Sequence, residues 1–289
     1  MKNTNHNPEQ IIDLLAASTR SPKGKYSADE SYKMLEERLA GKRKRLRLRT
    51  IQFISAAAAI LICVLGWSVY TYMEPVEMQT VSTLAEVRTI QLPDGSEVAL
   101  NNFTTITYPR KFKNKYREVR ISGEAYFEVT SDKNHPFIVQ TGTVNVEVLG
   151  THFNVEAYDR DSEVKTTLFE GSVAVSNKEE TVKTILVPNE RAIYNKVEGS
   201  LTKETATDAW TNISWKEGKI IFINQPLKEI ARQLTNTFNT PILIENETLK
   251  DYKMTGRFVD GESLNEILQL LQTAGNFEIT KSKERILIK

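Results

Sequence analysis

Residues 50–73, TIQFISAAAAILICVLGWSVYTYM, carry no charged side chain, and the organisation of the rest of the chain follows from them. About 24 residues would extend roughly 36 Å as an α-helix, which is enough to cross a bilayer. A buried helix of a soluble core is the alternative, but such helices rarely stay uncharged for so long. A signal peptide would place a shorter apolar run nearer Met1, before a cleavage site. We therefore expect one transmembrane helix over 50–73.

The charges on the two sides of this run differ in sign. The basic stretch KRKRLRLR (42–49) precedes it, whereas Glu74 and Glu77 follow it. Because basic flanks stay in the cytoplasm, we expect a single-pass protein of the inner (plasma) membrane with a cytoplasmic N-terminus and a periplasmic C-terminus. The same basic stretch could be interpreted as a nucleic-acid patch, but beside a membrane helix a topology signal is the better interpretation.

The bulk composition excludes several classes of protein. The chain has 289 residues, with 38 Lys and Arg against 37 Asp and Glu, so no whole-protein field attracts nucleic acid and we expect no direct nucleic-acid partner. The length favours two or more folded units. Cys63 is the only cysteine, so intramolecular disulfides do not hold the fold.

The segment before the span, residues 1–49, has the signatures of two helices. Asn7 and Pro8 are typical of a helix start, and Ser27 with Glu30 forms a capping box before a helix that should end near Gly41. About fifty residues bury two apolar stripes poorly, so a partner protein is a natural place for them, with a loosely ordered tail as the alternative. The candidate partner-binding residues are those of the two stripes: Ile11, Leu14, Leu15, Tyr32, Leu35 and Leu39.

Residues 85–198 show short strand signals at close spacing and almost no helical periodicity. A hairpin is predicted around Pro93-Asp94-Gly95, and further short runs rich in Val, Phe and Tyr alternate with turn residues such as Gly142 and Gly171. Many evenly spaced short strands predict a sandwich, barrel or stacked-sheet fold. We expect the chain to be mainly β and membrane-anchored.

The pattern changes from closely spaced strands to alternating strands and helices, and residues 210–289 predict a small α+β domain. Pro226 opens a helix with an apolar face that includes Leu227 and Leu234, and a second helix is expected from Ser263 to Gly275. Strands are expected before, between and after these helices, with a closing hairpin at the C-terminus.

The sequence contains no group of residues that is typical of an active site for a separate substrate. The three histidines, His6, His135 and His152, do not form a metal set, and phosphate-binding, dinucleotide-binding and nucleophile-elbow motifs are absent. Glu124 with Glu128 could do acid/base work, but strands routinely carry acidic residues on solvent faces. We expect no enzyme, no metal and no cofactor.

Several ordered blocks resemble the FecR-type family of transmembrane anti-sigma regulators. These are IQLPDGSEVALN, ISGEAYFEV, PFIVQTGTVNVEVLGTHFNVEAY, TTLFEGSVAV and LVPNERAIY, between Val87 and about Val197. The tail from Trp215 to Lys289 is similar to the short N-terminal module of secretins and TonB-dependent transducers, which commonly follows the FecR-like domain.

The resemblance implies a relay across the envelope. An outer-membrane TonB-dependent transducer would contact the periplasmic FecR-like domain (85–198) or the C-terminal domain (210–289). The transmembrane helix (50–73) would connect them to the cytoplasmic helical segment (1–49), which would bind an extracytoplasmic-function sigma factor. Family members often carry a longer and more helical cytoplasmic segment than this one. The alternative is a membrane-anchored periplasmic binding or structural β protein without a sigma partner, and an envelope enzyme is a third and weaker interpretation.

The pair Gly150-Thr151 is a candidate self-cleavage site, since some proteins resembling this family break at a Gly-Thr bond. A threonine hydroxyl can attack the preceding carbonyl if the backbone is strained, and glycine tolerates such strain. His152 lies beside the pair as a candidate proton carrier. The alternative is that Gly150 marks a bulge or a bend and that Thr151 is an ordinary strand residue.

Overall fold

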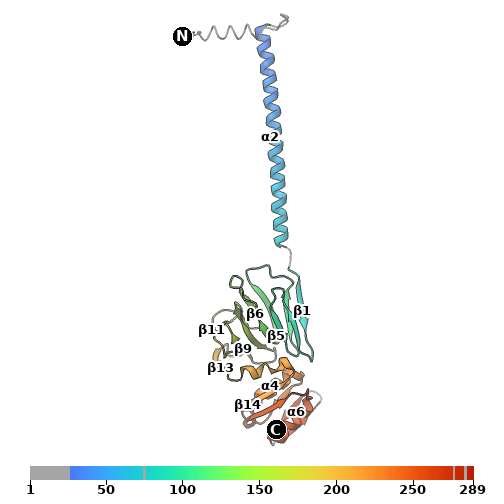
Figure 1. Ribbon diagram of the computed structural model, residues 1–289, viewed down its shortest axis with the longest axis vertical. Helices are drawn as coiled ribbons and strands as arrows, with labels where there is room; N and C mark the ends of the chain where they lie inside the picture. The colour runs from blue at the N-terminus through green and yellow to red at the C-terminus, as the bar shows by residue number, and fades with distance from the viewer. Residues whose placement is uncertain (1–26, 74–75, 276, 283–284) are drawn as a thin grey trace. The chain divides into compact units, whose positions relative to one another are not determined.

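A computed structural model of the protein describes residues 27–73, 76–275, 277–282 and 285–289 (Figure 1). The chain divides into two compact units, Met1–Pro75 and Val76–Lys289, and each is described by itself. The predicted first helix, with Ile11, Leu14 and Leu15, lies outside the described residues.

The described residues of the first unit form helix α2 (Ala28–Met73), which has 46 residues. Its start is the predicted capping box: the Ser27 amide donates to Glu30 Oε2 at 2.9 Å, and the Glu30 amide donates to Ser27 Oγ at 3.3 Å. The prediction that this helix ends near Gly41 is wrong, because α2 continues through Gly41 into the apolar run. A glycine inside a helix costs only about 1 kcal/mol relative to alanine, which is too little to interrupt a helix that is continued on both sides.

The apolar part of α2 is long enough to cross a membrane. Residues Ile51–Tyr70 have a mean hydropathy of 2.1, and none of this stretch is buried inside the protein. Large apolar side chains such as Phe53 and Ile62 are therefore exposed along it. Twenty uncharged helical residues that no described part of the chain covers fit a single-pass membrane protein.

The second unit begins with thirteen strands that form two halves joined through β5 (Arg117–Glu128). The first half has the order β1-β4-β5-β6-β7-β10-β11, and the second has the order β2-β3-β5-β8-β9-β12-β13. The bounds of the other strands are β1 Met78–Ser82, β2 Arg88–Gln91, β3 Glu97–Leu100, β4 Thr105–Pro109, β6 Phe137–Gln140, β7 Val144–Val148, β8 His152–Ala157, β9 Glu163–Glu170, β10 Val173–Asn177, β11 Lys183–Leu186, β12 Glu190–Asn195 and β13 Leu201–Thr205.

Strand β5 changes partners near Gly123. Arg117 to Arg120 pair in parallel with β6, whereas Gly123 to Glu128 pair with the antiparallel strand β8. At Gly123 φ is +116°, and a Cβ atom there would lie 2.4 Å from Thr104 Oγ1. Only glycine permits this backbone and this close approach, so Gly123 allows one long strand to serve both halves.

The two halves enclose a hydrophobic core. Fully buried side chains from both, including Phe127, Phe137 and Phe153, pack together, and the Phe127 and Phe153 rings stack at 5.0 Å between centroids. Burial of such aromatic side chains is the main source of stability in a two-layer β fold. The predicted mainly-β fold class is confirmed, with one long apolar helix near the N-terminus and a small helical region at the C-terminus.

The C-terminal part has its own core. Its helices are α3 (Ala209–Asn212), the 3-10 helix η1 (Ser214–Glu217), α4 (Leu227–Phe238), α5 (Glu247–Lys250) and α6 (Leu264–Gly275); its strands are β14 (Ile220–Pro226), β15 (Ile242–Ile244), β16 (Lys253–Phe258), β17 (Ile279–Lys281) and β18 (Ile286–Ile288). The predicted apolar face of α4 is buried at Leu227, Ile230 and Leu234, and the helix expected from Ser263 is α6. Strand β14 pairs with β16, and β18 lies between β15 and β17.

Candidate functional site

The C-terminal part packs on one face of the second β half. Part of this contact is a small apolar cluster. It joins Ala99, Tyr126 and Phe169 of the strands to Ile213 and Trp215 of the C-terminal part. The exposed Trp210 ring packs edge-on against Phe169 at 4.9 Å between centroids. This cluster is separate from the core between the strands and from the core of the C-terminal part.

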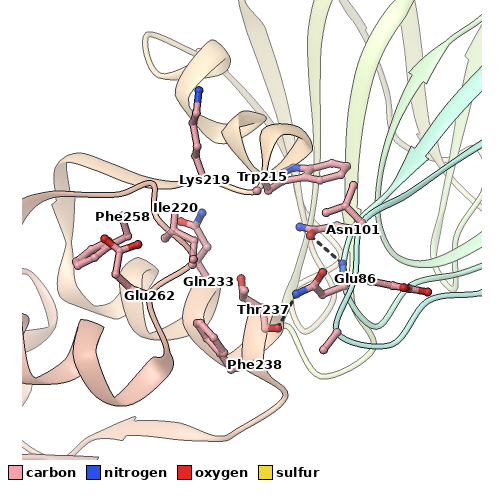
Figure 2. A pocket seen from close by; sticks show the side chains of 15 residues that line it. Glu86, Asn101, Trp215, Lys219, Ile220, Gln233, Thr237, Phe238, Phe258 and Glu262 are labelled. Atoms are coloured by element: carbon pink, nitrogen blue, oxygen red, sulfur yellow. Dashed lines mark hydrogen bonds between the residues drawn. The ribbon is translucent and has the colours of Figure 1, made fainter.

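A cavity of about 340 Å³ lies beside this cluster (Figure 2). Asn101 and Asn102 line it from the β part, and Gln233, Phe238 and Phe258 line it from the C-terminal part. Across it, Asn102 Nδ2 donates to the carbonyl oxygen of Thr237 at 3.0 Å. The cavity is therefore bounded by both parts.

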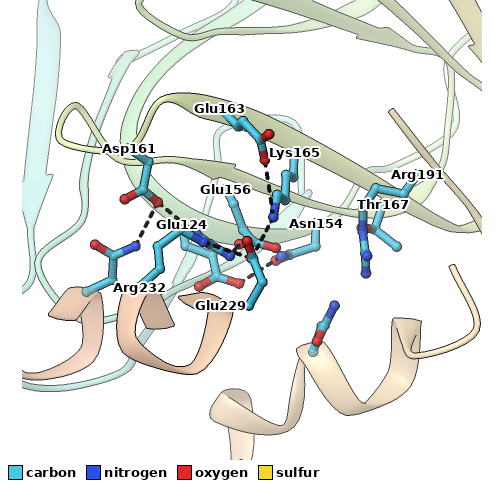
Figure 3. Close-up of polar contacts among 12 residues, drawn as sticks. Glu124, Asn154, Glu156, Asp161, Glu163, Lys165, Thr167, Arg191, Glu229 and Arg232 are labelled. Carbon is cyan, nitrogen blue, oxygen red and sulfur yellow. Dashed lines mark hydrogen bonds and ion pairs between the residues drawn. The ribbon is translucent and has the colours of Figure 1, made fainter. Parts of the chain in front are cut away.

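The remainder of the contact consists of charged and amide side chains (Figure 3). Strand pairing brings Glu124 of β5 beside Glu156 of β8, and Glu156 beside Lys165 of β9, so the three side chains share one face. Helix α4 presents Glu229, Arg232 and Asn236 to this face. We call the set Glu124, Glu156, Asp161, Lys165, Glu229 and Arg232 the polar seam.

Arg232 is the hub of the polar seam. Its Nη1 lies 2.8 Å from Asp161 Oδ2, its Nη2 lies 3.0 Å from Glu156 Oε2, and its Nε lies 3.1 Å from Glu229 Oε2. Asp161 also accepts from Asn236 Nδ2 at 2.9 Å. Because the guanidinium uses nitrogens on three sides, it fixes the position of α4 over β8 and the turn that follows β8.

Glu229 connects Arg232 to the strands. Its Oε2 also lies 2.8 Å from Lys165 Nζ. Burial opposes ionisation of this carboxyl, but the charges of Arg232 and Lys165 outweigh burial and lower the pKa of Glu229 to about 2. Glu229 is therefore ionised at neutral pH.

Glu124 has the opposite character. Burial, reinforced by the nearby charge of Glu156, raises the pKa of Glu124 to about 8, although Asn154 and Asn101 donate hydrogen bonds that favour the ionised form. Asn101 Nδ2 donates to Glu124 Oε2 at 2.7 Å, and Asn154 Nδ2 donates to Oε1 at 2.8 Å. Glu124 is thus a buried carboxyl that carries a proton at neutral pH. A second cavity, of about 780 Å³, is lined by Glu124, Glu156, Glu229 and Arg232 among others.

Among the described residues, no group of three or more His, Cys, Asp or Glu side chains could hold a metal ion. Glu124 and Glu128, four residues apart on β5, lie in different surroundings. Glu128 is half-exposed and contacts Lys216 Nζ at 3.4 Å, so the two carboxyls do not form one site.

The candidate partner-binding residues that the structure describes lie on α2. Tyr32, Leu35 and Leu39 are 68%, 54% and 49% exposed, so no part of the chain that the structure describes covers this apolar stripe. An uncovered apolar stripe on a helix is a surface that a partner can bury.

Gly150 and Thr151 are placed just before β8. At Gly150 φ is +157°, and a Cβ atom there would lie 2.6 Å from Ser131 Cα, so close backbone packing requires glycine. Thr151 is buried, and its Oγ1 donates to the carbonyl oxygen of Ser172 at 3.2 Å. His152 is half-exposed, and its Nδ1 lies 3.2 Å from Glu170 Oε2. The strand register shifts after His152, as at a β-bulge.

The polar seam was not predicted from the sequence. Glu229, Arg232 and Asn236 recur at spacings of three and four, which places them on one polar stripe of α4. That stripe is a usable signal for a polar contact, because charged residues beside an apolar face often border an interface. Its partners on β8 and in the following turn are about seventy residues away, and no sequence pattern indicates them.

Comparisons with known proteins give a consistent result. The family model described as "FecR protein" matches residues 79–174, and the one described as "FecR, C-terminal" matches residues 219–288. Two crystal structures of a candidate anti-sigma factor from Parabacteroides distasonis ATCC 8503 are 31% identical to the chain. Each match covers 73% of this chain and 98% of that one, with TM-scores of 0.63 and 0.64. No curated protein sequence matches the chain.

Proposed function

The chain belongs to the FecR family, and from this premise we propose that it is a membrane-spanning anti-sigma factor that relays a signal from the cell envelope to transcription. Family membership and the similarity to a candidate anti-sigma factor support an anti-sigma role in signal transduction. The observation that carries the proposal is the order of parts: FecR and C-terminal FecR segments follow one apolar helix of membrane-spanning length.

We propose that the partner on the cytoplasmic side is an extracytoplasmic-function sigma factor. The exposed stripe of Tyr32, Leu35 and Leu39 supports this, since burying one leucine contributes roughly 1.5–3 kcal/mol to association. On the other side of the inner membrane, the signal would come from a TonB-dependent outer-membrane transducer that contacts the periplasmic unit, Val76–Lys289.

Sigma binding is tested with the purified full-length protein in nanodiscs and the sigma factors of its own cell. Leu35→Asp should weaken binding at least tenfold, because a charge replaces a buried leucine. Lys33→Asp introduces the same side chain on the opposite face of α2 and should change binding less than threefold. Equal loss in the two variants, or no binding by the wild type, would contradict the proposal.

The proposed topology has its own test. A reporter that works only in the periplasm should be active when fused after Thr80 and inactive when fused after Gly41, because the basic stretch lies before the span. The reverse pattern would remove the sigma-binding proposal and leave the alternative of a membrane-anchored binding or structural β protein without a sigma partner.

We also propose that the chain can cleave itself between Gly150 and Thr151. Thr151 Oγ1 would attack the Gly150 carbonyl carbon, the C–N bond would break as the amine takes a proton, and water would open the resulting ester to a Gly150 carboxylate. The constrained backbone at Gly150 supports this: φ is +157°, and a Cβ atom added there would lie 2.6 Å from Ser131 Cα. His152 would carry the proton.

Self-cleavage is tested by the intact mass of the purified protein. The wild type should yield one fragment that ends at Gly150 and one that begins at Thr151, whereas Thr151→Ala should stay whole and Thr151→Ser should still cleave. A wild type that remains intact in cells and after days at neutral pH would exclude the reaction and leave Gly150 with a packing role only.

A further inference from the structure

The β part and the C-terminal part can each stay folded when the contact between them changes. The β part buries its own core, which includes Phe127 and Phe153, and the C-terminal part buries a second core, which includes Phe222 and Leu234. Between them lie a small apolar cluster and the polar seam. Contacts rich in polar groups between two cores open at lower cost than the cores themselves.

The hydrogen-bond partners of Glu124 suit two protonation states of its carboxyl group. Both of its oxygens accept from amide groups, and Asn154 Oδ1 is buried without a hydrogen-bond partner among the described residues. Rotating the Asn154 amide by 180° would place that oxygen where it can accept a proton from Glu124 Oε1. The site can therefore hold Glu124 as a carboxylate that accepts from Asn154 Nδ2, or as a neutral acid that donates to Asn154 Oδ1.

Burial is the main reason that Glu124 favours its neutral form. The charge of Glu156 adds to the effect of burial, and the charge of Arg232 opposes it. The other charged side chains that line the cavity are balanced, with four acidic and four basic groups: Glu163, Glu204, Asp208 and Glu229, and Lys165, Arg191, Lys228 and Lys253. The uncharged neighbours of Glu124 are Asn101, Asn154 and Tyr158. A negative charge on Glu124 is therefore costly because it lies where water screens poorly.

We propose that Glu124 makes the docking of the C-terminal part on the β part dependent on a proton: docking holds Glu124 neutral, and ionised Glu124 favours release of α4 from the strands. The cavity beside Glu124 gives water a path for proton exchange. The proposed proton dependence concerns Val76–Lys289 alone, and its test does not depend on whether the protein binds a sigma factor.

The direction of the effect follows from proton linkage. The docked state holds the proton up to higher pH than the open state, where water solvates the carboxylate. Docking is therefore strongest at low pH within the range 5 to 9 and weakens as the pH rises. From pH 6 to pH 9 the docking equilibrium constant should fall at least tenfold.

The experiment uses the full-length protein in nanodiscs with Cys63→Ser, so that spin labels can be placed at Lys178→Cys in the β part and Thr273→Cys in α6. Distance distributions between the labels are measured from pH 6 to pH 9. The protein with native Glu124 should give one short distance at pH 6 and a growing long-distance population toward pH 9. Glu124→Gln, which mimics the neutral acid, should stay docked throughout, whereas Glu118→Gln, exposed on the same strand, should respond like native Glu124.

A second variant covers the case in which Glu124→Gln folds poorly. Glu156→Gln removes the neighbouring charge that raises the pKa of Glu124 most. The change in the docked fraction between pH 6 and pH 9 should therefore become smaller. Either of two results would overturn the inference: a distance distribution that does not change from pH 6 to pH 9 with native Glu124, or an opening in Glu124→Gln or Glu156→Gln that keeps the full pH dependence.

Discussion

Replacement of Arg232 by methionine tests whether the polar seam holds the C-terminal part in place. The change keeps most of the apolar stem and removes the guanidinium that contacts Asp161, Glu156 and Glu229 at 2.8, 3.0 and 3.1 Å. Removing one partner from a fully buried ion pair costs about 3–5 kcal/mol, because the other charge is left buried. The Arg232 side chain is 23% exposed, so we expect a loss of about 2–3 kcal/mol at pH 7.

The control lies on the same helix. Lys228 pairs with Asp251 at 2.9 Å, but the two side chains are 52% and 78% exposed, so Lys228→Met should cost less than about 1 kcal/mol. The measurement is urea unfolding of the compact unit Val76–Lys289, followed by the fluorescence of Trp210 and Trp215. If Arg232→Met and Lys228→Met destabilise this unit equally, by less than about 1 kcal/mol, the polar seam does not stabilise the contact.

Two further predictions concern the same unit. Gly123→Ala should destabilise it by about 2 kcal/mol or more, measured by urea unfolding, because the new Cβ would lie 2.4 Å from Thr104 Oγ1 at a φ of +116°. Gly142→Ala, with no atom within 4 Å of its Cβ, should change stability by less than about 0.5 kcal/mol, and an equal effect would contradict the proposed role of Gly123. Since the pKa of Glu229 is lowered to about 2, its ion pairs add stability above the unfolded pKa of 4.5 that is lost as the pH falls toward 2. In thermal unfolding, the wild type should lose at most about 3 kcal/mol of stability between pH 4.5 and pH 2 through this group, and Glu229→Gln should lose much less.

Local patterns were sufficient to predict several elements. The apolar run sets the membrane-length part of α2, Pro93-Asp94-Gly95 sets the hairpin of β2 and β3, and the apolar stripes set α4 and α6. In each case the residues that decide the element are neighbours in sequence, so spacing alone carries the information. The capping box at Ser27 is confirmed for the same reason.

Elements that depend on distant contacts were not predicted. Strand β5 alternates buried and exposed residues only in its first half, because its second half is covered on both faces. The sequence predicted only short strands in this region, and not one strand of 12 residues. The end expected near Gly41 failed for a related reason: helix formation is cooperative, so a single glycine does not decide where a long helix stops. The polar seam depends on a contact between α4 and β8, which a local pattern cannot specify.

The most direct test of the central claim is isolation of the full-length protein from its native membranes, with identification of copurified partners by mass. A membrane-spanning anti-sigma factor should bring down one extracytoplasmic-function sigma factor in near-stoichiometric amount, and Leu35→Asp should reduce that amount at least tenfold while Lys33→Asp retains it. Membranes that contain the intact wild-type protein but yield no sigma factor with it would contradict the claim.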